Sequence, residues 1–511
     1  MGVKLFTLKN FFKTVAIVTI FSVSEKFLGF IYRIYLSRTI GSEGMGLYQV
    51  ALSVFALLLT VCCSGTPITV SRLMTKHKAE NNGKKVFGVI SSGLFITLIT
   101  ALPLCLIFVL FNKPLSFLFA DSRCKNIFFV VLPGLIFTSL YAVLRGVLWG
   151  NKDFLPYSII ELLEEVCMIV CGIVLISNAT SIYQGAFSAG VAVTISYIFS
   201  FTLAVIVFFL RKNKLTNPIK ELKPLLASAT PITAMRTASS LANSLVSIIL
   251  PLRLISAGYT QSQAMNMFGA ALGQAIPILY IPTTLIGSFT LVLVPELSEN
   301  FYKGNFTSLK KDLEKALKFT ILISCLFIPP FLVCGKELGV LIFNNAESGT
   351  YLSASSFLMV LMSISSITTS MLNSMGLENK TLIYYLISGA FMLACIWFLP
   401  YVCGIYSLLI GFTFVFGLTS LLNLILLSKT CKQSIGYKKF LFCAVGFIIP
   451  TCILGFLIKS IFLSLLGSLL TTLLCLILTV VFNCLFYLCF NLISLDGFLQ
   501  KIKIITKRKS T

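Results

Sequence analysis

The sequence predicts an all-α integral membrane protein with about 14 transmembrane helices. The chain has 511 residues, of which 57% are hydrophobic and only 11% are charged. Soluble proteins carry about 25% charged residues. The apolar residues fall in blocks of about 20, the length that crosses about 30 Å of hydrocarbon. These features exclude a soluble enzyme, a coiled coil, a disordered protein and an outer-membrane barrel.

Breaks at charged residues and at Gly, Pro and Asn divide the apolar blocks into successive helices. The predicted ranges are 11–36, 47–72, 86–111, 126–149, 157–177, 183–210, 225–252, 264–294, 313–334, 351–375, 381–401, 405–428, 439–459 and 464–493. The loops between them are too short for an inserted ATPase or kinase domain, and no G-x-x-x-x-G-K-[ST] motif is present. The sequence therefore argues against direct use of ATP.

The helices at the two ends of the chain need separate interpretation. Lys4, Lys9 and Lys13 precede the first helix, as basic residues precede the apolar part of a signal peptide. The apolar stretch nevertheless continues to about Leu36 and has no small-residue cleavage site, so we interpret it as a retained span. The last two helices carry almost no charge apart from Lys459, and we expect them to face lipid.

The basic residues alternate between the two sides of the membrane. With the N-terminus placed inside, 28 of the 40 Lys and Arg residues fall on the inner side and 6 on the outer side. Cytoplasmic loops of membrane proteins collect Lys and Arg. This asymmetry explains the net charge of +23 without nucleic acid as a partner. It predicts a multi-pass protein whose N-terminus and C-terminus both lie inside.

Two stretches of the chain show the same order of features. The predicted second helix ends at Pro67 before a basic loop, and the predicted eighth helix ends near Pro295 before a similar loop. Repeated halves around a midplane site are a common transporter architecture. We therefore predict two pseudo-repeated six-helix lobes around a central cavity, plus two C-terminal helices. The expected segments are an N-terminal lobe at 1–223, a C-terminal lobe at 224–434, and an extra two-helix segment with a basic cytoplasmic tail at 435–511.

Six basic residues lie within or at the ends of the predicted helices. A charge at bilayer depth is costly, so it usually faces a cavity or a partner. Snorkelling to the headgroup layer is the alternative, chiefly for Arg72, Arg145 and Arg253. Guanidinium groups match phosphate oxygens. The candidate anion-binding residues in a hydrated cavity are Lys26, Arg33, Arg72, Arg236 and Arg253.

Four acidic residues accompany these cations. Glu25 lies in the first predicted helix, and Glu161, Glu164 and Glu165 lie in the fifth. Glu161 and Glu165 share one helical face because they are four residues apart. We interpret the four carboxylates as structural partners of the cations, or as groups that take part in ion coupling.

Other site chemistry has little support in the sequence. His77 is the only histidine and lies in a basic loop. The 16 cysteines lie almost entirely in apolar runs without a C-x-x-C pair, where cysteine acts as a small hydrophobic residue. We therefore expect no catalytic residue, no metal site and no cofactor.

An ordered set of stretches resembles the stage V sporulation protein B group of the MOP (multidrug/oligosaccharidyl-lipid/polysaccharide) flippase superfamily. The stretches are FLGFIYRIYLSRTIGSEGMGLYQ (27–49), GTPITVSRL (65–73), LRGVLWGNKDFLPYSIIELLEEV (144–166), FGAALGQAIPILYIPTTLIGSFTLVLVPELSE (268–299) and LNSMGLENK (372–380). They cover both halves of the chain in order. The group is similar to the peptidoglycan-precursor (lipid II) flippases.

The resemblance implies two six-helix lobes and alternating access in the bacterial plasma membrane. It implies transport of a polyprenyl-pyrophosphate-linked sugar, driven by a coupling ion (H+ or Na+) or by the membrane potential. The family pattern carries Lys26, Arg33, Arg72 and Arg253 over as pyrophosphate contacts. This chain departs from the pattern twice: no acidic residue precedes Arg253 in Ser247–Leu252, and Glu164 is followed four positions later by Met168 rather than by Arg.

Three functions remain open at this level. The first is a flippase for a cell-wall or polysaccharide precursor, with a role in sporulation or in general wall growth. The second is a cation-coupled multidrug exporter of the same superfamily, which would use the carboxylates of the fifth helix. The third is a membrane glycosyl- or acyltransferase, which the single histidine and the short outer loops disfavour.

Overall fold

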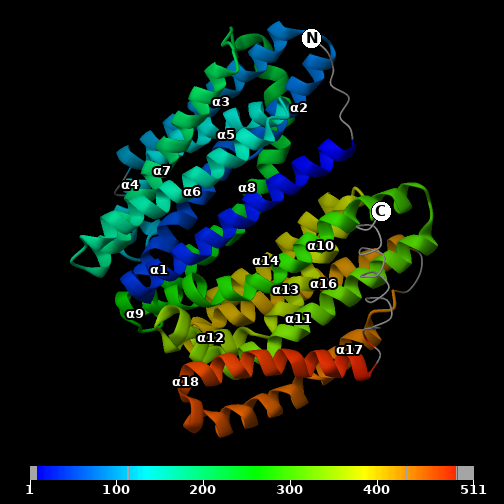
Figure 1. The fold of residues 1–511 in the computed structure, drawn as a ribbon. Helices are drawn as coiled ribbons and strands as arrows, with labels where there is room; N and C mark the ends of the chain where they lie inside the picture. Colours follow the sequence, from blue (N-terminus) through cyan, green and yellow to red (C-terminus); the bar gives the residue numbers. More distant parts are fainter. Residues whose placement is uncertain (1–7, 112–113, 432–434, 491, 493–511) are drawn as a thin grey trace. The chain divides into compact units, whose positions relative to one another are not determined.

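The chain folds into helices (Figure 1). The computed structural model describes residues 8–111, 114–431, 435–490 and 492. Within these ranges the regular elements are α-helices, one 3-10 helix and one π-helix, without β-strands. In this part of the chain, ten helices are long and apolar enough to cross a membrane, or up to 12 spans if each of two bent pairs counts as one. The predicted all-α membrane class is confirmed.

The predicted number of 14 spans is not confirmed, although each predicted range overlaps a helix. The predicted spans 11–36 and 47–72 fall in one long apolar segment, Val18–Ala79. The helix over 157–177 has sufficient length, but its three glutamates exceed the charge of an ordinary span. These two differences account for the lower number, and the number 14 stays a prediction.

The first compact unit comprises Met1–Gly269 together with Leu399–Gly404. Its helices are α1 (Leu8–Cys63), α2 (Thr66–Ala79), α3 (Gly83–Leu110), α4 (Ser122–Val131), α5 (Gly134–Gly150), α6 (Phe154–Ser177), α7 (Ile182–Leu210), α8 (Ile219–Ser256), α9 (Gln261–Phe268) and α15 (Pro400–Cys403), with a 3-10 helix at Pro114–Leu118. Within this unit α6 lies along α7, and α5 packs against α2, α3 and α7 (Figure 1).

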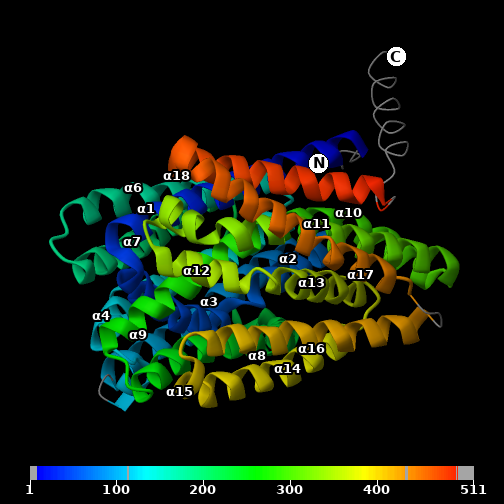
Figure 2. The same ribbon diagram turned by 90° about the horizontal axis from the view of Figure 1, so that it is seen from below.

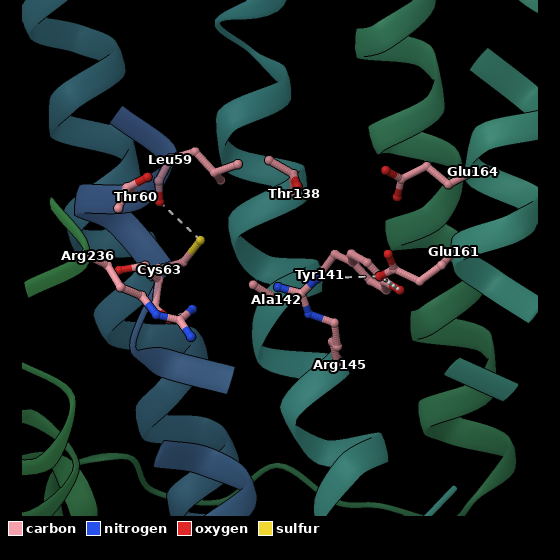
Figure 3. Close-up of a pocket in the computed structure, with 11 residues that line it drawn as sticks. Leu59, Thr60, Cys63, Thr138, Tyr141, Ala142, Arg145, Glu161, Glu164 and Arg236 are labelled. Carbon is pink, nitrogen blue, oxygen red and sulfur yellow. Dashed lines mark hydrogen bonds and ion pairs between the residues drawn. The ribbon is translucent and has the colours of Figure 1, made fainter. Parts of the chain in front are cut away.

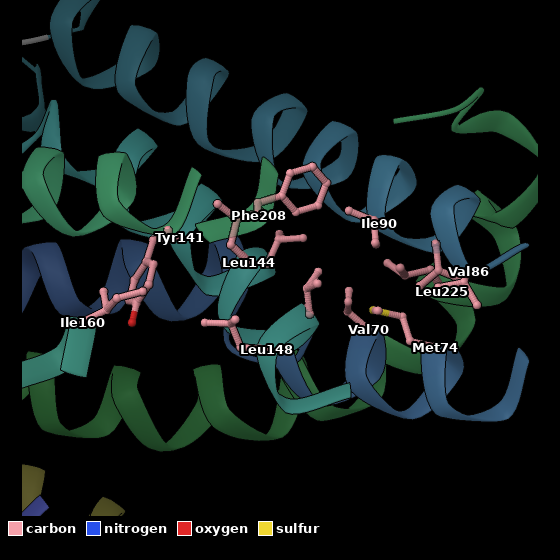
Figure 4. Packing of buried hydrophobic residues seen from close by; sticks show 14 residues of the cluster. Val70, Met74, Val86, Ile90, Tyr141, Leu144, Leu148, Ile160, Phe208 and Leu225 are labelled. Carbon is pink, nitrogen blue, oxygen red and sulfur yellow. The ribbon is translucent and has the colours of Figure 1, made fainter. Parts of the chain in front are cut away.

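A buried apolar cluster holds six helices of this unit together (Figure 4). It joins α2, α3, α5, α6, α7 and α8, with Met74 and Leu225 among its fully buried members. Because lipid tails are as apolar as leucine, close packing rather than exclusion of water stabilises such a cluster within a membrane. Tyr141 belongs to the cluster, and the packing fixes the face that α5 turns toward α6.

α1 contains a kink at a glycine, and two residues separate its end from the start of α2. Gly41 has φ 66° and ψ −176°, a conformation that residues with a side chain rarely adopt. Gly46 lies five residues further along α1. A Cβ at this position would collide with the backbone carbonyl of Met265 in α9, so only glycine allows the two helices to come this close. α1 ends at Cys63, and α2 begins at Thr66 with Pro67 in its first turn, where the missing N–H has no helical partner.

The second compact unit comprises Ala270–Phe398 and Ile405–Thr511. Its helices are α10 (Ile276–Tyr302), α11 (Phe306–Phe343), α12 (Ala346–Ser355), α13 (Leu358–Ser374), α14 (Glu378–Phe398), α16 (Tyr406–Cys431), α17 (Lys438–Gly446) and α18 (Ile448–Cys489), preceded by a π-helix at Gly269–Ala275. α14 and α16 lie side by side (Figure 2).

The two units repeat one packing pattern. In the first, α3 packs on α2 and α5, α5 packs on α7, and α7 packs on α6. In the second, α11 packs on α10 and α13, α13 packs on α16, and α16 packs on α14. Bent pairs occupy the same place in both series, α4 with α5 at 43° and α12 with α13 at 60°. This is the pseudo-repeat that the sequence predicted.

The last two predicted helices are the two parts of α18, which bends at Gly467, together with α17. α18 packs along α11. Lys459 lies 2.8 Å from the Glu337 carboxylate of α11 and donates a hydrogen bond of 3.0 Å to the carbonyl of Val333. One face of this pair is therefore bound to α11 by polar contacts, while other faces carry exposed apolar residues, as expected for contact with lipid.

The compact units and the predicted segments divide the chain differently. The sequence places α8 in the C-terminal lobe, whereas in the structure α8 packs against α1, α2 and α3 of the first unit. The basic tail expected within 435–511 lies in residues 493–511, outside the described residues. The predicted lobes at 1–223, 224–434 and 435–511 stay a prediction.

Candidate functional site

A pocket of about 230 Å³ lies within the first unit, between α1, α5, α6 and α8 (Figure 3). Four of its lining residues are charged, two arginines and two glutamates. The lining residues are Leu59, Thr60, Cys63, Ser64, Thr138, Tyr141, Ala142, Arg145, Glu161, Glu164 and Arg236. Three of the predicted site residues therefore meet in one place: Arg236, Glu161 and Glu164.

Arg145 of α5 brings a guanidinium group into this pocket. Its Nη1 lies 3.5 Å from Oε1 of Glu161. The group lies 5.4 Å from the ring centre of Trp149 and 6.0 Å from that of Tyr141, close enough for cation–π attraction. Its Nε is buried and has no hydrogen-bond partner among the described residues. A guanidinium has five N–H donors, and at least this one donor of Arg145 is without an acceptor in the described part of the chain.

The sequence contained a signal for Arg145 and Tyr141. Thr138, Tyr141, Ala142 and Arg145 follow the spacing i, i+3, i+4, i+7, which places them on one face of α5. This polar stripe on an apolar helix indicates a cavity-facing surface. Our prediction instead treated snorkelling of Arg145 as an equal alternative and left Arg145 out of the binding set.

Glu161 and Glu164 project from α6 toward α5 and α7. The Tyr141 hydroxyl donates a hydrogen bond of 2.7 Å to Oε1 of Glu161, the same oxygen that faces Arg145. Oε2 of Glu164 is buried without a hydrogen-bond partner in the described part of the chain. Glu161 is thus held by two groups of α5, whereas Glu164 keeps an unused acceptor.

Arg236 reaches the pocket from α8. Its Nη1 donates a hydrogen bond of 3.1 Å to the carbonyl of Ser64, in the break between α1 and α2. The next residue, Gly65, donates its N–H to the Thr233 hydroxyl at 3.2 Å. α8 therefore binds the polar backbone groups that the helix break leaves without intrahelical partners. Arg236 is exposed and lines the pocket.

The predicted residues of α1 lie outside the pocket lining. Lys26 is exposed, while Arg33 is partly buried and close to Tyr48. Glu25 lies within electrostatic range of Glu161 and Arg145. Glu165 lies against Gly29 of α1, where a Cβ would come within 2.9 Å of its Oε1. The structure thus places the α1 carboxylate near the pocket and brings Glu165 to α1.

Arg72 and Arg253 lie away from the pocket, at positions along the α8 axis that differ from that of Arg236. Arg72 of α2 donates a hydrogen bond to the hydroxyl of Ser228, which is about 12 Å from Arg236 along the helix. Arg253 lies with its guanidinium 4.8 Å from the ring centre of Tyr401 in α15, about 25 Å along α8 from Arg236. A single phosphate group cannot contact residues at all three levels at once.

His77 lies outside the pocket at the end of α2. Its Nδ1 is 2.9 Å from Oε2 of Glu80, and its Nε2 is 3.4 Å from Oε2 of Glu221 in α8. The hydrogen bond from His77 lowers the pKa of the Glu80 carboxyl below its usual value. No group of three or more His, Cys, Asp or Glu side chains with metal-site geometry occurs among the described residues.

Residues 11–301, more than half of the chain, match the family described as Polysaccharide biosynthesis protein. The chain belongs to this polysaccharide biosynthesis protein family. Two relatives come from Bacillus subtilis (strain 168). Stage V sporulation protein B is 24% identical over 67% of this chain and 69% of its own length. Lipid II flippase MurJ is 20% identical over 61% of this chain and 62% of its own length.

Solved structures share the fold at low sequence identity. Lipid II flippase MurJ in an inward closed conformation matches with a TM-score of 0.70 and 16% identity, over 92% of this chain and 98% of that one. A multidrug resistance MATE family transporter of the MOP superfamily, in an inward-facing conformation, matches with a TM-score of 0.66 and 14% identity, over 80% and 94%. This family member therefore has the fold of the MOP superfamily, as the resemblance predicted, and the similar MurJ and MATE proteins are a flippase and a transporter rather than enzymes.

Proposed function

We propose that the protein is a flippase that moves a polyprenyl-pyrophosphate-linked cell-wall or polysaccharide precursor across the bacterial plasma membrane by alternating access. A pyrophosphate-sugar headgroup cannot cross hydrocarbon unaided, because a charged group needs water or protein partners at every depth. The names of two relatives, a lipid II flippase and a sporulation protein, support this substrate class and a role in the cell wall or in sporulation.

One observation carries the proposal: two arginines of different helices line one small pocket. Arg145 and Arg236 both face the space of about 230 Å³. Sites for drug-sized ligands usually measure about 300–1,000 Å³, so the pocket suits a phosphate-bearing headgroup better than a whole lipid-linked sugar. Guanidinium groups bind phosphate through paired hydrogen bonds. In this proposal Arg145 and Arg236 bind the pyrophosphate.

The remaining predicted cations would contact the headgroup at other depths. Arg72, Arg236 and Arg253 occupy successive levels along α8, and Lys26 and Arg33 lie on α1. Along such a path the phosphate would move from one cation to the next and keep contact with at least one of them at every depth. Glu25, Glu161, Glu164 and Glu165 would balance these charges or bind the coupling ion, H+ or Na+, unless the membrane potential drives the step.

The orientation follows from the loop charges. With 28 basic residues on one side and 6 on the other, we propose that the N-terminus and the C-terminus lie in the cytoplasm. A green fluorescent protein fused to the C-terminus should then fluoresce in cells, and an alkaline phosphatase fusion at the same point should be inactive. Active phosphatase would reverse the proposed orientation.

A cation-coupled multidrug exporter is the second candidate. The MATE fold neighbour and the two glutamates of the pocket favour it. A site for organic cations needs available carboxylates. Glu161 already binds Arg145 and Tyr141, which leaves Glu164 as the one pocket carboxyl with an unused acceptor among the described residues, against two arginines. The pocket therefore suits an anionic ligand better than a cationic one.

Native mass spectrometry on the purified protein separates these functions. The protein would be offered an undecaprenyl-pyrophosphate-linked sugar and, separately, a lipophilic organic cation. We expect selective retention of the pyrophosphate lipid, lost in the double variant Arg145→Ala, Arg236→Ala. The control is Arg211→Ala, because Arg211 pairs with Asp153 at 3.2 Å outside the pocket. Retention of the cation alone would replace the flippase with the exporter.

A further inference from the structure

Basic and acidic side chains are equal in number in the pocket lining. Its two arginines face two glutamates, and among the described lining residues no other side chain is normally ionised. A pyrophosphate diester brings two negative charges into this space. At low dielectric an uncompensated charge is costly, so a phosphate that binds Arg145 leaves the Glu161 carboxylate without its cation.

Glu161 occupies the place at Arg145 that a phosphate would take. Its Oε1 faces Nη1 of Arg145 at 3.5 Å and accepts the Tyr141 hydroxyl at 2.7 Å. The ion pair is longer than a charge-assisted hydrogen bond of about 2.7–2.9 Å. Arg145 therefore has a carboxylate nearby without a good hydrogen bond to it, and a phosphate oxygen with better geometry competes well for the guanidinium.

Tyr141 fixes the position of Glu161 in the pocket. The tyrosine is buried in the apolar cluster with only 3% of its surface exposed, so its hydroxyl cannot turn to water. It holds Glu161 beside Arg145. The Glu161 carboxylate therefore lies beside Arg145, the guanidinium that a phosphate ligand would bind.

We propose that Glu161 is an exchangeable counter-anion: the phosphate of the ligand displaces it from Arg145, and the released carboxylate takes up one proton from water. This inference rests on the proposed function. One O–H bond forms on Glu161, the proton comes from solvent, and the Arg145 charge passes from the carboxylate to the phosphate. When the phosphate leaves on the other side, Glu161 gives up the proton and pairs with Arg145 again, so proton movement accompanies transport.

Several ionisable groups surround Glu161 and set its proton exchange. The groups of α5 are Tyr141 and Arg145, α1 contributes Glu25, α6 contributes Tyr157 and Glu164, and α7 contributes Tyr197. Arg236 of α8 lines the same pocket. Glu25 and Glu164 are further carboxyl groups within electrostatic range of Glu161.

Isothermal titration calorimetry in two buffers with different ionisation enthalpies measures the proton uptake. The probe is an N-acetylglucosaminyl farnesyl pyrophosphate, because a diester has no phosphate group that titrates near pH 7, unlike a monoester. We expect wild-type protein to take up about one proton per ligand. Glu161→Gln should remove this uptake and bind about tenfold more tightly, an ordinary coupling magnitude.

Two further variants extend the calorimetric test, one as a second disruption of the Glu161 contacts and one as a control. Tyr141→Phe removes one bond to Glu161, so it should tighten binding and retain the uptake even if Glu161→Gln does not fold. Asp153→Asn disrupts a matched ion pair outside the pocket and should leave affinity and uptake unchanged.

The possible failures are distinguishable. Wild-type protein that binds the probe but shows the same uptake in Glu161→Gln, or weaker binding in Glu161→Gln and Tyr141→Phe, overturns the counter-anion inference alone. Absence of binding in the wild type, or unchanged binding in Arg145→Ala, Arg236→Ala, overturns the proposed function and the inference with it.

Discussion

Arg145 shows how one residue joins packing and site chemistry. It lies one turn beyond Tyr141 on α5, and Tyr141 is anchored in the apolar cluster. The cluster therefore fixes the helix face that carries the guanidinium. Glu161 and the two aromatic rings surround that group without accepting a hydrogen bond from it. The chain thus holds a partly buried cation in a fixed orientation and leaves its Nε–H without an acceptor among the described residues.

Replacing Arg145 by Lys tests whether the fork geometry matters beyond the charge. Lysine keeps one positive charge but loses the paired planar donors. A hydrogen bond to a charged group contributes about 1.5–3 kcal/mol, so Arg145→Lys should weaken binding of the pyrophosphate lipid by about tenfold or more. Titration of that lipid in nanodiscs measures the change. Equal affinity in the two proteins would show that charge alone suffices.

Residue types predicted part of this site. Glu161, Glu164 and Arg236 were found because charged residues are conspicuous within apolar runs. The position four residues after Glu164 holds Met168, so the sequence offered no arginine for α6. The structure supplies one from the neighbouring helix, since Arg145 faces Glu161 across the α5–α6 contact. Such a pairing depends on helix rotation, which one sequence does not reveal.

At the scale of elements, the breaks in helices position the site. α1 bends at Gly41 and stops at Cys63, and α8 covers the gap before α2 through Arg236 and Thr233. The sequence predicted helices and their order well because span length and apolarity are local properties. The sequence predicted a loop between 36 and 47, where the structure has the kink of α1 at Gly41, because glycine occurs both in turns and in bent helices.

Gly46 provides a test of one close helix contact. Alanine usually stabilises a helix by about 0.8–1.0 kcal/mol relative to glycine. At Gly46 the added Cβ would collide with the Met265 carbonyl, and backbone cannot move as easily as a side chain. We therefore expect Gly46→Ala to destabilise the protein by about 1–3 kcal/mol, as overpacking does.

Thermal unfolding in detergent measures this effect. Gly83→Ala is the matched control, because a Cβ at Gly83 meets no atom within 4 Å. The control should be neutral or slightly stabilising. Equal melting temperatures for Gly46→Ala and Gly83→Ala would contradict the close contact between α1 and α9.

At the scale of the whole molecule, the two units share a packing pattern but differ in charge. The pocket with its two arginines and two glutamates lies in the first unit. The matching helices of the second unit, α13 and α14, carry charge only at Glu378 and Lys380, in the first turn of α14. The two units thus share one helical scaffold, and the charged side chains of the first unit form the site. Composition and loop charge predicted the scaffold, whereas the site depended on contacts between helices.

Flipping of a fluorescent undecaprenyl-pyrophosphate-linked sugar in proteoliposomes tests the central claim most directly. A membrane-impermeant quencher reports how much lipid reaches the outer leaflet. We predict that wild-type protein and Arg211→Ala flip the lipid, and that Arg145→Ala, Arg236→Ala reduces flipping to the level of protein-free vesicles. Unchanged flipping by that double variant would contradict the role of the pocket. Absence of flipping by the wild type, together with transport of an organic cation, would contradict the function itself.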